Sequence, residues 1–385
     1  MAITINTNPA AGSSVHDAMW HVVSSDNSGV TDFKYVFDIW INGVQQIRVK
    51  QFVEPNNGKG YFDAAPIVRN SMTYEWFEPT NASAYVAEPN VSGQAAIIYQ
   101  LRVGEDVSGV TTTNMASGET SGYNWAPPMF GRRVVSLADK LNKWFTNRPL
   151  SGSTKLAENL FIPFYATPGP ITLYCEKFDA SNNIIGSTLS GSATVIEAGF
   201  VQMNIGTTAL SATLSTTFDD SVRYYEVWFE DFEKFRVYLK CNPKYTPFPV
   251  HFVNRWGMYD THRFDLASKL NMDIDRKSFG QRDFQFNGNA VDYKSTSNRY
   301  YEGKINYSNK STWAYKLNSD ALTDAEYEWL AELFTSPQIL VEIDGYFYPA
   351  TIKRNNYEYN KFISDRLKAF EVEFEFNSSR MTQLR

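Results

Sequence analysis

A capped helix within a run of strands constrains the fold of this chain more than any other feature. In the segment TDAEYEWLAELF, the Thr323 side chain can accept the N–H of Glu326, and the Glu326 carboxylate can reach back to the N–H of Thr323. This reciprocal pair is a capping box. The apolar residues that recur at helical spacing are Tyr327, Leu330, Ala331 and Phe334. Because Pro337 cannot continue a helix, we predict one short helix over Thr323–Phe334 whose apolar face packs on neighbouring strands.

Strand patterns surround this helix. The segment QILVEIDGYFYPATI contains two extended runs joined by Asp344-Gly345, a dipeptide typical of two-residue hairpin turns. The later segment AFEVEFEF alternates apolar and acidic residues, as does a strand with one buried face. Upstream, Pro249–Asp265 predicts a strand pair around Trp256-Gly257, and the polar segment Arg276–Tyr301 predicts a long excursion. We assign residues 221–385 to a C-terminal β domain with one helix.

The composition limits the classes of partner. The chain has 36 Lys and Arg against 42 Asp and Glu, a net charge of −6, so it lacks the basic surplus that neutralises nucleic-acid phosphates or anionic lipids. Its 385 residues predict two or three domains. Aromatic residues make up 15% of the chain, an enrichment typical of β-structure and of large protein–protein contacts.

Targeting signals are not visible in the sequence. The segment MAITINTNPAAG has neither the basic start nor the apolar core of a secretory signal. There is no run of about 18 apolar residues, so we expect no membrane span and no membrane partner. Cys175 and Cys241 are therefore expected to be free thiols in a protein made in a reducing cytoplasm.

The clearest hairpin lies in the N-terminal block. Five residues alternate on one side of its first strand, and these are Phe33, Tyr35, Phe37, Ile39 and Ile41. Asn42-Gly43 then supplies a two-residue turn. We predict a β-sandwich over residues 1–122. Its last part, 106–122, is rich in Ser, Thr and Gly, and we expect a long polar arm there that is mobile in an isolated subunit.

The middle of the chain predicts two smaller parts. Residues 123–150 predict a connector with a short helix, since RRVVSLADKLNKWF has an apolar stripe at helical spacing. Residues 151–220 predict a small β-sandwich, whose size favours a core shared with a neighbour. The fold class that follows is mainly β, with several β-sandwiches and a C-terminal α+β domain.

Patterns typical of catalysis or metal binding do not occur. None of the four histidines is spaced as metal ligands are; they are His16, His21, His251 and His262. Asp260 is close to His251 and His262 in the sequence, but we can name no further residue at a position that would complete a zinc or acid–base site. Cys175 and Cys241 lie in no nucleophile motif, and no Gly-x-Ser-x-Gly or phosphate-binding loop is present. We expect no catalytic residue, no metal and no cofactor, and hence a protein that is not an enzyme.

Two groups of carboxylates leave alternatives open. One consists of Glu226, Glu230, Asp231 and Glu233, and the other consists of Glu371, Glu373 and Glu375. Glycosidases use two carboxylates about 5–10 Å apart. Strict alternation along the last strand first indicates a solvated sheet face, with Lys353 and Arg354 as cross-strand partners. A further hypothesis is that either group lines a channel, because an acidic lumen repels DNA phosphates.

Four tryptophans near loops or turns allow a carbohydrate-binding interpretation. They are Trp76, Trp125, Trp256 and Trp313. Packing in a core or an interface is the interpretation that we favour for them.

Two stretches carry a resemblance to a known family. The first is Ser13–Asn70, in which the hairpin Phe33–Gly43 precedes an Asn-Gly loop and the strand start Gly60–Asp63. The second is PVHFVNRWGMYDTHRFD, Pro249–Asp265, with the helix and strands that follow it. Both resemble structural proteins of tailed bacteriophages that infect Bacteroidota, including crAss-like phages. The part of the chain between them shows no such resemblance.

The resemblance implies a virion component of the tail or its connector. We expect an oligomeric tail hub, ring, adaptor or baseplate protein that is assembled in the host cytoplasm. Its partners would be copies of itself in a ring, other tail or connector proteins, and DNA in passive transit. Ring interfaces need two different complementary surfaces on each subunit, which several linked β-domains provide. The alternative is a receptor-binding adhesin or a head decoration protein with carbohydrate-binding β-sandwiches.

Overall fold

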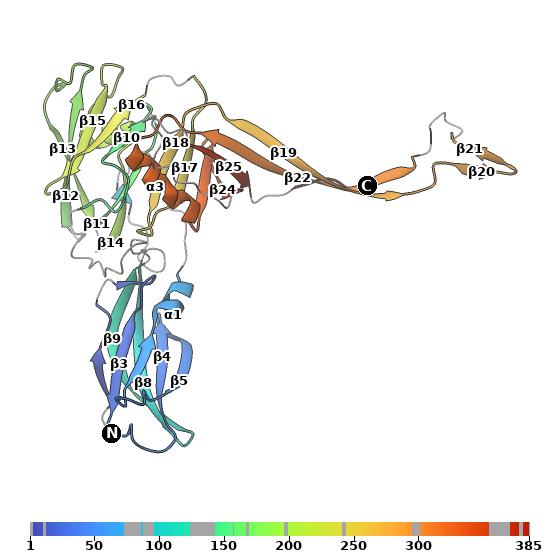
Figure 1. Cartoon of the computed structure of the whole chain (residues 1–385). Helices are drawn as coiled ribbons and strands as arrows, with labels where there is room; N and C mark the ends of the chain where they lie inside the picture. The colour runs from blue at the N-terminus through green and yellow to red at the C-terminus, as the bar shows by residue number, and fades with distance from the viewer. Residues whose placement is uncertain are drawn as a thin grey trace. The chain divides into compact units, whose positions relative to one another are not determined.

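A computed structural model describes most of the chain. The described residues are 3–10, 13–72, 86–87, 96–123, 143–156, 158–166, 169–195, 199–240, 244–294, 300, 302–353, 370–376 and 380–384. Within them the chain is mainly β (Figure 1), which confirms the predicted fold class. The described helices are α1 (Ala65–Asn70), α2 (Thr207–Leu214) and α3 (Asp324–Thr335).

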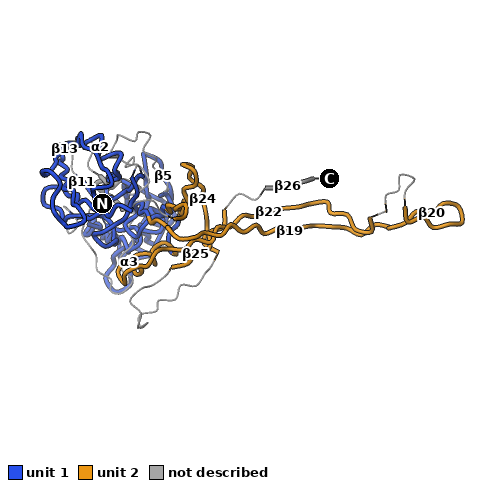
Figure 2. Tube along the Cα trace, turned by 90° about the horizontal axis from the view of Figure 1, so that it is seen from above, with its two compact units in different colours: residues 1–242, 251–261, 335–337 blue, residues 243–250, 262–334, 338–385 orange. Residues whose placement is uncertain are grey.

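The chain forms two compact units (Figure 2). Unit 1 comprises residues 1–242, 251–261 and 335–337, and unit 2 comprises residues 243–250, 262–334 and 338–385. Unit 1 contains two separate hydrophobic cores, one in the N-terminal block and one in the middle block.

The N-terminal block is a β-sandwich, as its strand pattern predicts. One sheet has the order β1-β3-β6 and the other the order β2-β9-β8-β4-β5. Their strands are β1 (Ile3–Thr7), β2 (Ser13–Ser14), β3 (Trp20–Ser25), β4 (Phe33–Ile41), β5 (Val44–Phe52), β6 (Gly60–Asp63), β8 (Ala96–Val107) and β9 (Val110–Tyr123). Residues from both sheets fill a single core between them.

The predicted β4–β5 hairpin is confirmed. Asn42 and Gly43 have φ angles of 50° and 74°, as a type I′ turn requires. The five alternating residues Phe33, Tyr35, Phe37, Ile39 and Ile41 are all buried in the core. Alternation therefore identified both the strand and the face that it buries.

The polar segment 106–122 is not a loop or arm, so this prediction is wrong. Most of it is β9, which pairs antiparallel with β8 from Val107↔Val110 to Ala96↔Tyr123. Several residues of this strand are threonines, which suit a β-strand because the side chain branches at Cβ.

The middle block is also a two-sheet structure around one core. Its larger sheet has the order β10-β16-β15-β12-β13 and its smaller sheet the order β11-β14-β7. The strands are β7 (Val86–Ala87), β10 (Ser151–Thr154), β11 (Phe161–Ala166), β12 (Gly169–Phe178), β13 (Leu189–Val195), β14 (Gly199–Asn204), β15 (Tyr224–Phe229) and β16 (Phe235–Leu239).

The boundary predicted between residues 220 and 221 falls inside this block. β15 pairs with β12 from Leu173↔Phe229 to Phe178↔Tyr224, and β16 pairs with both β15 and β10. Tyr225 and Val227 lie in the same core as Leu173. The small sandwich thus includes β15 and β16, which follow residue 220. Most of the predicted helix in the 123–150 connector, residues 124–142, lies outside the described residues.

The C-terminal part of the chain contains an eight-stranded sheet, most of whose residues belong to unit 2. Its order is β18-β17-β23-β24-β25-β22-β19, with β26 paired to β22 beside this path. The strands are β17 (Phe248–Val253), β18 (Tyr259–Phe264), β19 (Lys269–Gly280), β22 (Lys304–Asn318), β23 (Ile339–Ile343), β24 (Tyr346–Ile352), β25 (Glu371–Phe376) and β26 (Arg380–Leu384). The strands β20 (Gln285–Asn287) and β21 (Ala290–Asp292) form a hairpin between β19 and β22.

Helix α3 confirms the capping box but buries a different face. Thr323 N–H donates to Glu326 Oε2 at 2.9 Å, and Glu326 N–H donates to Thr323 Oγ1 at 3.3 Å. The fully buried residues are Trp329, Leu330 and Leu333. Tyr327 and Phe334, which we predicted to be part of the buried face, are half-buried at its margin. Their ring centroids lie 6.0 and 5.7 Å from that of Phe370. The apolar stripe is thus rotated by part of a turn, with Leu330 at its centre.

Candidate interaction surfaces

The second stretch of the phage resemblance forms a tight turn between β17 and β18. Asn254 organises this turn, because its Oδ1 accepts the N–H groups of Trp256 at 2.9 Å and Met258 at 3.1 Å. Its Nδ2 donates to the carbonyl of Phe145 at 2.9 Å. Gly257 has a φ angle of 77°, which favours glycine. The residue types of this motif are therefore explained by backbone geometry.

The turn and the start of β18 are bonded to the segment before β10. Thr146 donates its hydroxyl to Asp260 Oδ2 at 2.6 Å. The indole Nε1 of Trp256 donates to Asn147 Oδ1 at 3.2 Å. Trp256 is buried, so the structure places this tryptophan in packing and not in a sugar site.

The first stretch of the resemblance is likewise part of a core. A Cβ added at Gly60 would lie 2.6 Å from the Tyr35 ring, which is closer than side-chain atoms approach. Tyr35 donates its hydroxyl to the carbonyl of Gly58 at 2.7 Å. Asp63 Oδ1 accepts the N–H groups of Met19 and Ala65 and so fixes the start of α1. These residues determine the fold of the N-terminal sandwich.

The histidines of the described residues have structural partners. His21 lies between Asn8 at 2.9 Å and Tyr99 at 2.8 Å, and burial lowers the pKa of its imidazole to about 4. His251 Nδ1 lies 2.9 Å from Thr261 Oγ1. His262 is buried, with its ring in edge contact with Phe264. Among the residues that the structure describes, no group of three His, Cys, Asp or Glu side chains is arranged to hold a metal ion.

Cys175 is a core residue. Its side chain is fully buried in the middle block as a free thiol, and burial raises its pKa to about 12. A thiol held in its neutral form is a poor nucleophile. Cys241 lies outside the described residues.

The outer face of the larger middle sheet carries three cross-strand rows. Along β12 and β15 the odd-numbered residues enter the core and the even-numbered ones point outward. The three rows are Tyr174 with Trp228, Glu176 with Glu226 and Arg236, and Phe178 with Tyr224 and Tyr238. Charged and aromatic rows therefore alternate across this outer face.

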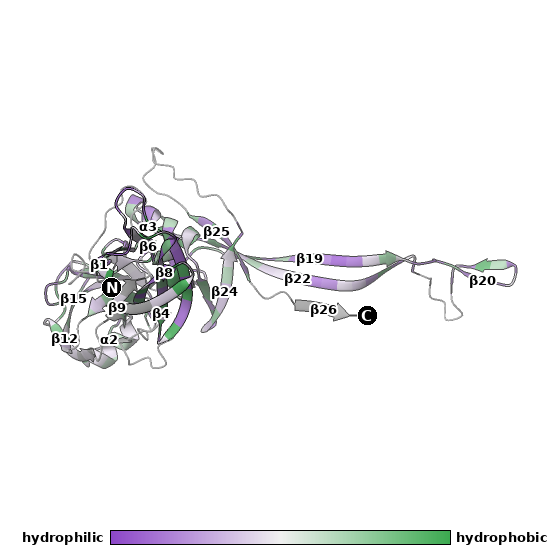
Figure 3. Cartoon of the chain, turned by 90° about the horizontal axis from the view of Figure 1, so that it is seen from below, coloured by the Kyte–Doolittle hydropathy of each residue, from purple (hydrophilic) through white to green (hydrophobic). Residues whose placement is uncertain are grey.

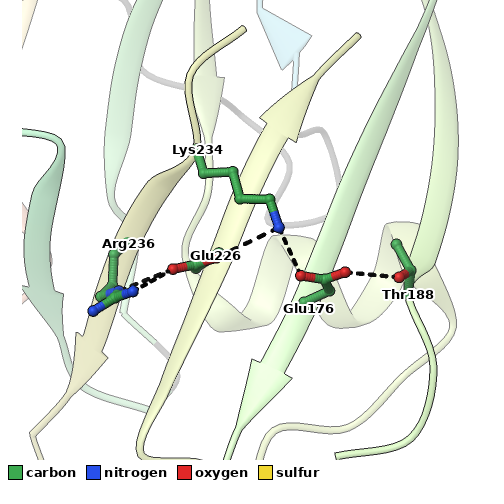
Figure 4. Close-up of polar contacts among 5 residues, drawn as sticks. All are labelled: Glu176, Thr188, Glu226, Lys234 and Arg236. Atoms are coloured by element: carbon green, nitrogen blue, oxygen red, sulfur yellow. Dashed lines mark hydrogen bonds and ion pairs between the residues drawn. The ribbon is translucent and has the colours of Figure 1, made fainter. Parts of the chain in front are cut away.

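The carboxylates of the middle row are bound to cations (Figure 4). Lys234 Nζ lies 2.8 Å from Glu176 Oε2 and 3.6 Å from Glu226 Oε2. Arg236 holds Glu226 Oε1 at 2.7 Å. The hydrogen bond from Lys234 and a second from Thr188 hold the pKa of Glu176 below its ordinary value. A glycosidase acid needs a raised pKa, so this geometry favours a stable polar surface over that chemistry.

The predicted acidic cluster is separated by this arrangement. Glu226 belongs to the bridged row, whereas Glu230, Asp231 and Glu233 lie in the exposed turn between β15 and β16. Glu176, which the sequence gives no reason to associate with Glu226, becomes its neighbour through strand pairing. Pairing of strands that are 50 residues apart gives no local signal in a single sequence.

Aromatic rings on the outer face stand beside one another. Tyr174 and Trp228 are stacked with their centroids 5.7 Å apart, and Lys234 Nζ lies 4.1 Å from the Trp228 centroid. Phe178 and Tyr224 are stacked at 4.6 Å. Trp76 and Trp125, which the sequence also suggested for sugar binding, lie outside the described residues.

The three glutamates of β25 project from one side of the strand, as their alternation predicts. Val372, Phe374 and Phe376 are buried, and Glu371, Glu373 and Glu375 are not. Lys316 bridges Glu371 at 2.7 Å, and Lys353 bridges Glu373 at 3.2 Å, which confirms Lys353 as a partner. Arg354 lies outside the described residues. The channel-lining role stays a prediction, and these lysines reduce the negative charge on which it depends.

The sequence interpretation missed an extended group of exposed apolar residues in the C-terminal part of the chain. We call the antiparallel pair of β19 and β22 the ribbon. Within the ribbon and the β20–β21 segment, the exposed large apolar residues are Leu270, Met272, Ile274, Phe279, Phe286, Val291, Tyr293, Tyr300, Tyr307 and Trp313. Hydrophobic and hydrophilic stretches are interspersed along the ribbon, with a hydrophobic stretch at the β20–β21 hairpin (Figure 3). The alternation of Leu270, Met272 and Ile274 with polar residues is the signal that could have identified β19.

Comparisons with known proteins identify no family. No protein-family model matches the chain, and no curated protein matches it. In the described part of the chain, no helix is both long and apolar enough to cross a membrane.

Proposed function

We propose that this chain is a structural component of a bacteriophage virion, an oligomeric tail hub, ring, adaptor or baseplate protein without enzymatic activity. The two motif stretches that resemble phage structural proteins support this proposal. Both stretches carry fold-determining residues, such as Gly60 and Asn254, whose contacts account for the residue types found there. A likeness in these positions is a likeness in architecture.

The ribbon is the observation that carries the proposal. β19 forms one edge of the eight-stranded sheet and pairs only with β22 along that sheet's order. It runs from Lys269 to Gly280 with nearly every residue exposed. The other edge of β22 is paired with β25 and β26, so β19 is the exposed edge strand of this sheet. Long exposed edges promote pairing with another chain. A subunit that presents such an element is suited to assembly.

The charges of the described surfaces fit contacts with protein. Acidic and basic side chains are paired on the outer face of the middle sheet and on β25, and the chain has a net charge of −6. A surface of paired charges does not attract DNA phosphates. DNA in transit would therefore pass this protein without binding to it.

The proposal is tested by locating the protein. Mass spectrometry and antibody labelling of purified phage particles should find the chain in the particle, and labelling should place it at the tail or the head–tail junction. Sedimentation velocity of the purified chain should show an oligomer. Absence of the chain from purified particles of the phage that encodes it would contradict the proposal.

A second candidate function is a receptor-binding adhesin or head decoration protein that binds glycans. The aromatic rows of the outer face favour it, because Tyr174 and Trp228 stand beside polar groups, as in sugar-binding surfaces. The face of the Trp228 ring is partly occupied, since Lys234 lies over it. A glycan array with the wild-type chain and the Trp228→Ala variant distinguishes the two functions. Binding that the substitution abolishes would support the adhesin.

A further inference from the structure

The apolar side of β22 passes from a covered region to an uncovered one. Leu317 is fully buried. The ring centroid of Tyr315 lies 5.1 Å from that of Phe248 and 5.6 Å from that of Phe376. Trp313, two residues further along the same side, is 40% exposed. The side of the strand that is buried in unit 2 is therefore partly exposed at Trp313 in the ribbon, although Ser311, two residues further on, is buried.

β19 supplies the other half of this apolar side. The register pairs Leu270 with Tyr315 and Met272 with Trp313. Directly opposed residues of an antiparallel pair point to the same side of the sheet. Ile274 continues the row, and the exposed fractions of Leu270, Met272 and Ile274 are 48%, 44% and 43%. We call these residues together with Trp313 the apolar face of the ribbon.

The opposite side of the ribbon is polar and its charges are compensated. Asp275 lies directly opposite Lys310. Asp273 accepts a hydrogen bond from Lys353 at 2.9 Å, and Lys316 bridges Glu371 at 2.7 Å. Charged groups of the polar side thus have partners within the chain, whereas Leu270, Met272, Ile274 and Trp313 remain 40–48% exposed.

The exposed apolar area matches one half of a protein–protein interface. A fully buried large aromatic side chain covers about 150–250 Å². The ten exposed apolar residues between Leu270 and Trp313 are 40–66% exposed, so they present roughly 800 Å² together. A stable interface of standard size buries about 800 Å² on each partner. The ribbon and the β20–β21 segment together are large enough for such an interface.

We infer that the apolar face of the ribbon, together with the exposed apolar residues of the β20–β21 segment, is a contact surface between two copies of this chain. The inference rests on the proposed function, since it names the partner of the assembly. A second copy is the occupant because the paired charges of the polar side need no charged ligand, and because the roughly 800 Å² exposed on the ribbon and the β20–β21 segment equals one partner's share of a standard interface. The mixed charges at the flanks, such as Asp275 and Lys310, suit a neutral, self-compatible neighbour better than DNA or an anionic membrane.

The experiment places two lysines on the apolar face. Sedimentation velocity over a concentration series is measured for the wild-type chain and for the Met272→Lys/Ile274→Lys variant. The matched control, Asn271→Lys/Thr312→Lys, adds the same charge to the polar side of the same strands. We expect the apolar-face variant to associate at least about 100-fold more weakly, since buried unpaired charge at the centre of an interface is costly. The control should associate as the wild type does.

A second variant guards against misfolding. Met272→Thr/Ile274→Thr keeps residues that favour strands while removing the apolar surface. Circular dichroism and the urea midpoint of each variant show that the fold is intact. If both apolar-face variants associate as strongly as the wild type, the inference is overturned. This result does not affect the proposed function. A wild-type chain that stays monomeric at high concentration also overturns the inference. The proposed function is overturned by a different result, the absence of the chain from phage particles.

Discussion

The β4–β5 hairpin and the ribbon are built on the same local pattern and differ in what covers them. In the first, Phe33, Tyr35 and Phe37 alternate along β4 and are buried beneath the partner sheet. In the second, Leu270, Met272 and Ile274 alternate along β19 and remain exposed. The N-terminal hairpin has a second sheet of the same chain against its apolar side, and the ribbon has none in the described residues.

This difference teaches that alternation specifies a face and not the partner of that face. Burial of apolar surface stabilises a sheet by roughly 25 cal/mol per Å², whichever chain provides the cover. The β4–β5 hairpin gains this stabilisation when the chain folds. On our account the ribbon gains it when copies assemble. Substitutions in the two regions should therefore affect different measurements.

The largest effect is expected from Phe37→Ala. Phe37 is fully buried and stacks on Phe62 with ring centroids 4.9 Å apart. Removing its ring should lower the free energy of unfolding by about 3–5 kcal/mol, measured by urea denaturation. Trp313→Ala, in the ribbon, should cost less than about 1 kcal/mol in the monomer. Equal losses for the two variants would show that the ribbon is covered within one chain.

Leu330→Ala tests the covered part of unit 2. Leu330 lies at the centre of the buried stripe of α3, so its truncation should cost about 2–5 kcal/mol in the same assay. Glu328→Ala on the exposed side of the helix is the control and should change stability by less than about 0.5 kcal/mol. A loss below about 0.5 kcal/mol for Leu330→Ala would mean that α3 is peripheral.

Asn254→Ala tests whether the β17–β18 motif is structural. The substitution leaves the N–H groups of Trp256 and Met258 and the carbonyl of Phe145 without their partner, which should cost about 1–3 kcal/mol. Asn271→Ala, in an exposed position of the ribbon, is the matched control. A stable Asn254→Ala variant that fails to assemble would instead place this turn in an interface.

The smallest effect concerns acid sensitivity of the β8–β9 hairpin. Hydrogen bonds from Lys50 at 2.5 Å and Thr111 at 2.7 Å lower the pKa of Asp106 to about 2, from an ordinary 3.8. A carboxylate with a depressed folded-state pKa stabilises the fold above about pH 4, and this contribution is lost as the pH falls toward 2.

The Asp106→Asn variant should therefore lose less stability than the wild type between pH 5 and pH 2. Urea midpoints measured across this range give the comparison, and Asp26→Asn, at an exposed position, is the control. The same acid sensitivity in wild type and Asp106→Asn would show that the Lys50 contact contributes nothing to the folded state.

Local signals in the sequence were sufficient for turns, caps and strands with one buried face. Asn42-Gly43, Asp344-Gly345 and the Thr323–Glu326 pair each act over two to four residues, and all three are confirmed. The polar strand β9 was missed because its pairing with β8, and not an apolar face, makes it a strand.

Long-range pairing explains the remaining errors. β15 follows the predicted boundary at 220 but pairs with β12, about 50 residues earlier, and β16 then pairs with β15. The Glu176–Lys234–Glu226 row exists only because of that pairing. The ribbon was missed for a related reason, since its strands are separated by the segment 281–303 and no segment among the described residues covers its apolar face.

One measurement tests most directly whether copies of the chain cover the apolar face of the ribbon. Hydroxyl-radical footprinting compares the oxidation rates of Met272 and Trp313 in dilute monomer and in the assembled particle, with the exposed Phe52 of β5 as an internal reference. Our account predicts that Met272 and Trp313 are oxidised several-fold more slowly in the assembly, relative to Phe52. Oxidation rates that are the same in monomer and assembly would contradict it.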